Sequence, residues 1–261
     1  IRVPSGAYAA FPAVETTGIF DQWAVFSQFD GDLGGGTSVT VALRYDREKR
    51  KQIASGASES ASFDQFQPKI SVKHQFTPDA MVYASYSQGF KSGGFNPPPE
   101  LFPLRNVDFD LIVRPERTKN VEVGFKSEWL DRRLRINGSV FATDYRNLQI
   151  FAFDPFAGQV TVNANKVRIW GAELEAVARL ADGLTIDGSV GYTHSRTRDY
   201  DGSGVNDGNT PPNTPSWTAN LGAEYARDIG AARLTARLDY HYVSKFYWQI
   251  GNLLHTPAYA F

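Results

Sequence analysis

Side chains along most of this chain alternate between apolar and polar with a period of two residues. A clear case places Leu184, Ile186 and Val190 on one face and Asp187 and Ser189 on the other. Successive side chains of a β-strand point to opposite faces, so this period predicts strands that separate two environments. Helical periodicity is nearly absent, and the chain is therefore predicted to be all-β.

Ten segments carry the alternation and are bounded by residues typical of turns. We predict strands at 21–31, 38–49, 66–77, 79–90, 118–129, 133–147, 166–180, 184–197, 215–226 and 232–245. Several of these segments are longer than a typical strand of a globular sheet. They fit tilted strands that cross a membrane in about nine to eleven residues.

The links between the predicted strands alternate in length. Short links lie at 31–37, 77–79, 130–132, 181–183 and 227–231, and long links lie at 50–65, 91–117, 148–165, 198–215 and 246–257. Outer-membrane barrels have short periplasmic turns and longer extracellular loops. We therefore predict an antiparallel transmembrane β-barrel, present as a partial wall. A soluble β-sandwich or propeller, such as a carbohydrate-binding protein, also alternates in polarity, but its loops need not alternate in length.

The strand phases assign each face to an environment. The residues expected to face lipid include Val121, Val123, Leu184, Ile186, Val190, Leu221 and Leu238. The residues expected to face the lumen include Glu122, Lys126, Asp187, Asn220, Glu224, Arg237 and Asp239. Aromatic girdles are expected at both membrane interfaces. The outer girdle would hold Trp23, Tyr86, Trp170, Tyr192, Trp217 and Tyr242, and the periplasmic girdle Phe76, Trp129 and Tyr225.

Composition excludes several classes of protein. The formal net charge of −1 argues against a nucleic-acid surface, and the absence of cysteine excludes disulfides and Cys-based metal sites. The longest apolar runs are too short for a transmembrane helix. The histidines have no metal-ligand spacing, and no catalytic triad motif occurs. We expect neither an enzyme nor a cofactor or metal site.

Several stretches resemble the β-barrel of TonB-dependent receptors. In that family a Pro-Glu segment leads into a strand with an aromatic-x-Glu-x-Gly-x-Lys pattern, and the strand after the next turn ends in Asp-Tyr. Residues 114–127 and 131–149 follow this pattern, and residues 82–96, 42–46 and 163–175 resemble further barrel strands. Val121 replaces the usual aromatic residue.

The resemblance implies a fold and a function. The family's barrel has about 22 strands around a plug, so residues 1–261 would supply about ten strands, with the plug domain and the final strands outside this chain. The implied function is active import of a scarce nutrient across the outer membrane of a Gram-negative bacterium. A ferric siderophore is the first expectation for the substrate, and a carbohydrate or another nutrient is the second. The implied partners are TonB, outer-membrane lipid and lipopolysaccharide. A passive porin-like channel is the alternative from another class.

Ligand contacts are expected in the extracellular loops. The candidates are aromatic and cationic side chains, namely Phe90, Lys91, Phe95, Arg105, Phe151, Phe153, Phe156 and Trp248. Exposed aromatic rings can hold a siderophore, a sugar or a polycyclic ligand. The alternative for the same residues is packing between loops or contact with lipopolysaccharide.

Overall fold

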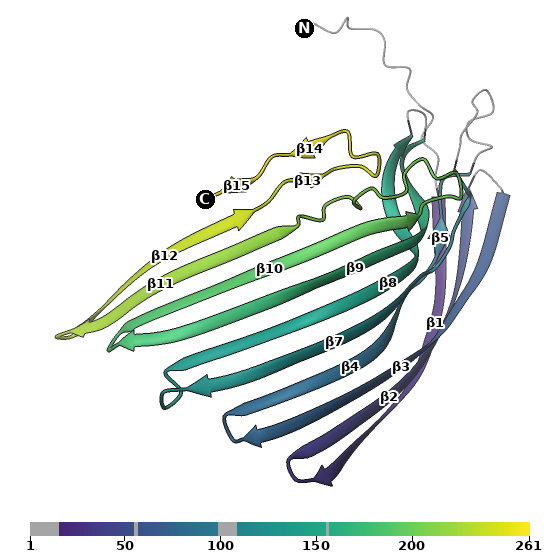
Figure 1. Ribbon diagram of the computed structural model, residues 1–261. Coiled ribbons are helices and arrows are strands. Elements are labelled where there is room, and N and C mark those ends of the chain that lie inside the picture. The colour runs from purple at the N-terminus through teal and green to yellow at the C-terminus, as the bar shows by residue number, and fades with distance from the viewer. Residues whose placement is uncertain (1–15, 55–56, 99–108, 155–156) are drawn as a thin grey trace, which may run out of the picture.

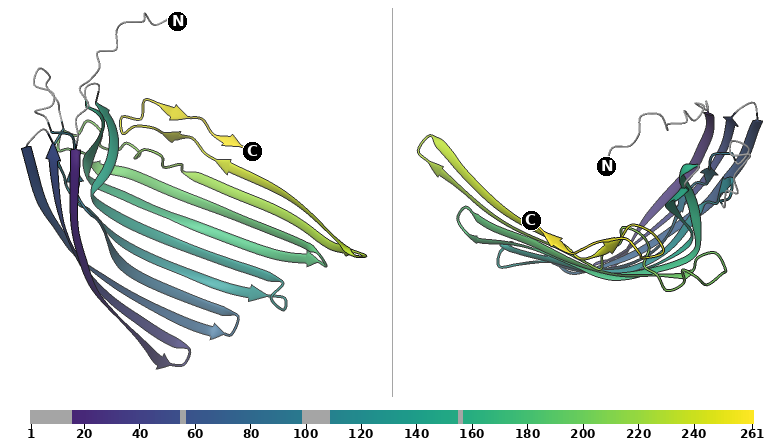
Figure 2. Two further views of the ribbon diagram at one scale, coloured as in Figure 1. Left: turned by 180° about the vertical axis from the view of Figure 1, so that it is seen from behind. Right: turned by 90° about the horizontal axis from the view of Figure 1, so that it is seen from above.

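The computed structural model describes residues 16–54, 57–98, 109–154 and 157–261, and it consists mainly of one curved antiparallel sheet (Figure 1). Eleven strands form this sheet in the order β1-β2-β3-β4-β7-β8-β9-β10-β11-β12-β15. Seen from above, the sheet is an open arc (Figure 2). Within the described residues, no helix has the length and apolar character needed to cross a membrane.

The strand bounds are as follows. The main sheet contains β1 (Thr16–Gly34), β2 (Thr37–Ala54), β3 (Ala57–Thr77), β4 (Ala80–Lys91), β7 (Glu116–Trp129), β8 (Leu134–Asp154), β9 (Gly158–Ala181), β10 (Leu184–Asp199), β11 (Trp217–Ile229), β12 (Ala232–Val243) and β15 (Tyr259–Ala260). Two small sheets pair β5 (Gly94–Phe95) with β6 (Ile112–Val113), and β13 (Phe246–Tyr247) with β14 (His255–Thr256).

The strands of the main sheet follow one another in chain order, with β5, β6, β13 and β14 set apart in the two small sheets. The turns that join β1 to β2, β3 to β4, β7 to β8, β9 to β10 and β11 to β12 gather along one edge (Figure 1). We call this edge the short-turn end and the opposite edge the long-loop end. At the short-turn end, Gly183 has a φ of 80°, and a Cβ there would lie 2.1 Å from the carbonyl oxygen of Ala226. The Asp182-Gly183 turn therefore requires glycine for both its backbone conformation and its close packing.

All ten predicted strands are present, and β15 adds an eleventh. Two of the predicted long links are wrong. Residues 50–54 and 57–65 continue β2 and β3, and residues 148–154 and 158–165 continue β8 and β9. The extensions of β2 and β3 carry polar residues on both faces, so they lack the contrast from which the other strands were predicted. The extension of β8 carries apolar residues on both faces, and that of β9 alternates Val160 and Val162 with Thr161 and Asn163, a period of two that was not used.

The strand register places the two predicted sets on opposite faces of the sheet. Val123 pairs with Val140, and Val190 pairs with Leu174, on the apolar face. This apolar face is not covered by other parts of the described chain, since 49% of Val123, 54% of Leu221 and 74% of Leu238 are accessible. A water-soluble sheet buries its apolar face in a core. The exposed apolar face therefore requires a lipid environment.

Aromatic side chains form a band on the apolar face toward the long-loop end. The ring centroids of Trp23 and Tyr45 lie 5.5 Å apart, those of Trp170 and Tyr192 5.6 Å, and those of Tyr192 and Trp217 4.7 Å. Each such pair contributes about 0.5–1.5 kcal/mol beyond area burial. The band has the position expected of an interfacial girdle, where amphipathic rings reach the lipid headgroups.

Replacement of Val123 with Arg tests the assignment of the faces. In the full-length barrel, Val123→Arg should lower the free energy of unfolding by about 2–4 kcal/mol, because the charge enters hydrocarbon. Ser85→Arg is the control, since Ser85 is half-buried on the polar face and pairs in register with Glu122. It should cost less than about 1 kcal/mol. Equilibrium unfolding in lipid vesicles measures both values, and equal losses would contradict the assignment.

Candidate functional site

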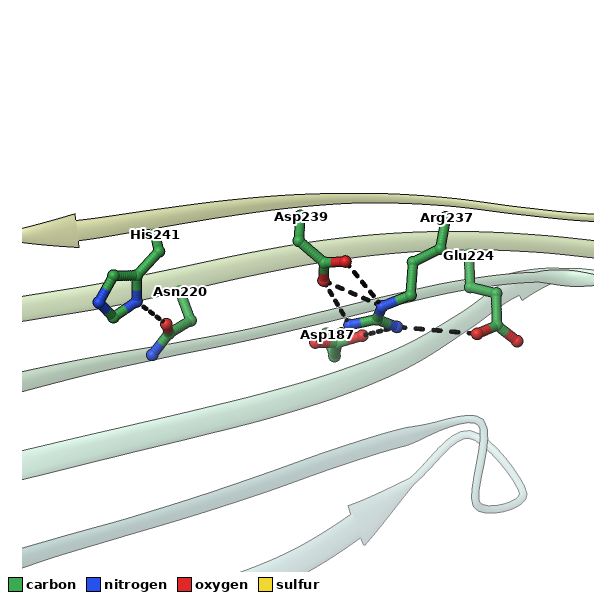
Figure 3. Close-up of polar contacts among 6 residues, drawn as sticks. All are labelled: Asp187, Asn220, Glu224, Arg237, Asp239 and His241. Atoms are coloured by element: carbon green, nitrogen blue, oxygen red, sulfur yellow. Dashed lines mark hydrogen bonds and ion pairs between the residues drawn. The ribbon is translucent and has the colours of Figure 1, made fainter. Parts of the chain in front are cut away.

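An arginine joins three strands on the polar face (Figure 3). Arg237 on β12 lies 3.1 Å from Asp187 on β10, 2.7 Å from Asp239 and 3.8 Å from Glu224 on β11. The Arg237 side chain is 41% exposed, so each ion pair stabilises the fold only weakly. The cluster keeps charged groups on a hydrated wall, as expected for the lumen side of a barrel.

A second polar contact crosses from β4 to β7. The Tyr83 hydroxyl donates a hydrogen bond of 2.6 Å to Glu122. The Tyr83 ring covers Gly124, where a Cβ would lie 2.6 Å from ring carbons, so glycine is needed for this approach.

The polar face also contains a shallow recess of about 310 Å³. Charged and amide side chains line part of it, namely Lys126, Asn137, Glu173 and Glu175. The recess therefore presents hydrogen-bond donors and acceptors, together with a positive and two negative charges, to a polar solute.

At the long-loop end, Asn163 on β9 clamps the segment before β7. The Arg114 backbone N–H donates to Asn163 Oδ1 at 2.8 Å, and Asn163 Nδ2 donates to the Arg114 carbonyl at 3.0 Å. Asn163 Nδ2 also donates to the Asn147 carbonyl at 2.9 Å. The side-chain amide of Asn163 thus accepts from the N–H and donates to the C=O of the same residue, as the backbone of a paired strand does.

Asn96 makes the same kind of clamp higher on the hairpin. It is 3% exposed, and it exchanges two hydrogen bonds of 2.8 Å with the backbone of Thr161. Asn96 Nδ2 also reaches the Asp110 carbonyl at 2.8 Å. The described parts of 92–116 are therefore held against the β8–β9 hairpin. The two clamps were not predicted from the sequence, because the asparagines at 147, 163 and 165 do not indicate their distant partners.

A small apolar core joins the same hairpin to two other segments. Ile150, Ala164 and Val167 are buried together, and Tyr200 and Ile250 pack against them. Near this core, Ser203 donates two hydrogen bonds to the Asp201 carboxyl and lowers its pKa. The long-loop end is thus a packed layer above the sheet, and its parts hold one another.

The ligand candidates on β4 and β5 do not share one face. Phe90 pairs with Arg117 and has the strand phase of Tyr86, so it belongs to the apolar face. Lys91 pairs with Glu116, and Phe95 lies on β5 opposite Ile112. Phe90 lies in β4 as the predicted strand 79–90 has it, whereas Lys91, predicted in the link 91–117, is the last residue of β4.

The remaining candidates lie farther along the chain. Phe151 and Phe153 belong to the extended strand β8 rather than to a loop, and they are 67% and 80% exposed. Trp248 is 57% exposed, and its ring centroid lies 5.6 Å from that of Phe246. The candidates Arg105 and Phe156 lie outside the described residues.

Comparison with known proteins identifies similar chains. Residues 3–261 match the family model for the TonB dependent receptor-like β-barrel. A pesticin receptor of Yersinia enterocolitica is 27% identical over 91% of this chain and 34% of its own length. The ferrichrome outer membrane transporter/phage receptor of Escherichia coli K12 is 29% identical over 98% of this chain and 32% of its own length. The chain thus spans about a third of the length of these curated relatives.

A solved structure supports the fold. The crystal structure of the ferric yersiniabactin uptake receptor from Yersinia pestis aligns with a TM-score of 0.77 at 23% identity. The alignment covers 95% of this chain and 38% of that chain. At this identity the likeness concerns the path of the strands and not the ligand.

Loss of the asparagine clamp should loosen one segment and leave the sheet intact. Asn163→Ala removes the bonds to Arg114 and Asn147, each worth about 1 kcal/mol. We expect faster amide hydrogen exchange over residues 109–116 and unchanged exchange in β11 and β12. Asn206→Ala, in another loop of the same end, is the control. Unchanged exchange in 109–116 would show that the clamp does not hold the segment.

Proposed function

This chain belongs to the TonB-dependent receptor β-barrel family, and we propose that it forms part of the wall of an outer-membrane receptor that imports a ferric siderophore. The observation that carries the proposal is the family match over residues 3–261, on a sheet whose apolar face is exposed and whose polar face holds ion pairs. The ferrichrome transporter among its relatives supports the choice of substrate class.

The proposed import needs parts beyond these residues. In the proposed receptor, a plug fills the lumen and TonB supplies energy through it from the periplasmic side. The short-turn end would face the periplasm and the long-loop end the exterior. A passive channel with the same wall would need neither plug nor TonB.

The proposed ligand contacts are the two exposed phenylalanines of β8. Phe151 and Phe153 alternate with Ile150, which is buried in the core of the long-loop end. Their own rings are left open, so they can pack on the apolar part of a ligand. A sugar ring could stack on the same two phenylalanine rings. Carbohydrate is therefore the second candidate substrate and one outcome of the uptake test below.

Uptake by the full-length receptor should depend on TonB. We expect cells that carry it to accumulate a radiolabelled ferric hydroxamate or ferric phenolate siderophore under iron limitation, and deletion of TonB should abolish the accumulation. Accumulation that continues without TonB would identify a passive channel. Accumulation of maltodextrin but of no ferric siderophore would assign the receptor to carbohydrate.

Removal of the two rings should weaken ligand binding. In the purified full-length receptor, we expect Phe151→Ala combined with Phe153→Ala to raise the Kd for the transported siderophore about ten-fold, which corresponds to about 1.4 kcal/mol. Phe76→Ala is the control, because Phe76 is a 63% exposed aromatic residue at the short-turn end. An unchanged Kd in the double variant, measured by quenching of intrinsic fluorescence, would remove these residues from the site.

A further inference from the structure

Only two charged side chains are buried within the described residues, and they are neighbours on one face of β2. Asp46 is 5% exposed and Glu48 is 8% exposed. Tyr45 packs against Trp23 in the aromatic band, so Asp46 and Glu48, which alternate with Tyr45 along the strand, lie on the polar face. A carboxylate withdrawn from water costs free energy unless its charge is paired, and buried acids of this kind are candidates for a functional role.

Each buried carboxylate holds an arginine. The Asp46 carboxylate accepts two hydrogen bonds of 2.6 Å from Nε and Nη2 of Arg44, and one of 2.5 Å from Gln67. Glu48 accepts a hydrogen bond from Nε of Arg50. The side chains of Arg44 and Arg50 are themselves 47% and 29% exposed. Each guanidinium is thus fixed from behind by a carboxylate and keeps N–H donors for an acceptor that comes from the lumen.

Two phenylalanine rings on β1 accompany the two arginines. Phe26 pairs in register with Arg44, and Phe20 pairs with Arg50. The guanidinium carbon of Arg50 lies 5.2 Å from the centroid of the Phe20 ring, within the range of a cation–π contact. Both phenylalanines lie three residues from Trp23 and therefore on the polar face, where 75% of Phe26 and 63% of Phe20 are accessible.

These four residues form one strip along the polar face. We call it the arginine–phenylalanine strip, made of Phe20, Phe26, Arg44 and Arg50. Because β1 starts at the long-loop end, Phe20 lies above the level of Trp23 and Phe26 lies below it. The strip therefore passes the level of the outer aromatic band on the lumen side, where a ligand that enters from the exterior would arrive first.

We propose that the arginine–phenylalanine strip is a further contact site for the siderophore and that it selects anionic ferric catecholates, an inference that rests on the proposed function. Catecholates are phenolate siderophores with paired oxygens on each ring, so their ferric complexes combine negative charge with aromatic surface. The guanidiniums donate to the anionic oxygens, and the phenylalanine rings pack on the catechol rings. An uncharged ferric hydroxamate without aromatic rings gains neither contact.

The proposed plug is the other candidate occupant of the strip. The open N–H groups of the two arginines and the position of the strip toward the exterior favour the ligand. A plug segment would cover the rings in the same way, but its contact would not distinguish one ferric complex from another. Selectivity between ligands of different charge therefore separates the two occupants.

Phe26→Ala tests the aromatic part of the strip. The purified full-length receptor is titrated with ferric enterobactin, an anionic catecholate, and with ferrichrome, an uncharged hydroxamate, and quenching of intrinsic fluorescence gives each Kd. We expect the native receptor to bind ferric enterobactin more tightly, and Phe26→Ala to raise the Kd for ferric enterobactin about ten-fold. The matched control is Phe29→Ala, which removes a 68% exposed ring from the opposite face of the same strand and should leave both Kd values unchanged.

Arg44→Gln combined with Asp46→Asn tests the cationic part of the strip. The double variant removes the guanidinium without leaving an unpaired buried carboxylate, and it keeps the net charge of the receptor unchanged. We expect the Kd for ferric enterobactin to rise by at least about ten-fold, and the Kd for ferrichrome to stay as in the native receptor. Arg47→Gln is the control and should bind both ligands as the native receptor does, since Arg47 is exposed on the opposite face of β2 and pairs in register with Trp23.

Several results would overturn the proposal. A native receptor that binds ferrichrome as tightly as ferric enterobactin, or binds neither, lacks the expected selectivity. Equal rises of both Kd values in the variants would assign the strip to the plug, and unchanged Kd values would leave the two arginines with a structural role. TonB-dependent uptake of ferrichrome would still support the proposed function, so failure of this proposal is distinguishable from failure of the proposed function.

Discussion

Backbone hydrogen bonding between neighbouring strands is the interaction on which this structure depends. In hydrocarbon, an unpaired N–H or C=O costs several kcal/mol, so a strand that crosses the membrane must pair along both sides. The antiparallel ladder provides this pairing on both sides for the strands between β1 and β12, and it leaves side chains free to divide between the two faces. The register is fixed at the same time, because a shift of one residue would turn Val123 toward water and Glu122 toward lipid.

The division of side chains explains which parts of the fold could be predicted. Where a strand separates lipid from water, its two faces differ, and residues 184–193 show the period of two plainly. Where β2 and β3 rise beyond the aromatic band, polar residues occupy both faces. The contrast then disappears although the hydrogen-bonded ladder continues, as between Arg50 and Ala61, which is why 50–65 was predicted as a loop. The extension of β8 differs, because Ile150 and Phe151 place apolar side chains on both faces, and the extension of β9 keeps a period of two in Val160, Thr161, Val162 and Asn163 that the prediction of a loop at 148–165 overlooked.

The candidate site was less predictable than the fold. Residue type indicated aromatic ligand contacts, but Phe90 has the strand phase of Tyr86 and therefore belongs to the apolar face rather than to a ligand site above the lumen. The clamps made by Asn96 and Asn163 join segments about 50 to 65 residues apart, and no local pattern encodes such a contact.

The neighbour-to-neighbour order of the sheet has a consequence for how the wall is assembled. Most hairpins close over a few residues, so little chain entropy is lost before their first contacts form. The passage from β4 to β7 is one of the few that must close over a long link, residues 92–115. Pairing of β4 with β7 thus costs more chain entropy than pairing within the β3–β4 or the β7–β8 hairpin. The kinetic barrier to assembly is accordingly concentrated at a few junctions between rapidly formed units rather than spread over the whole circumference.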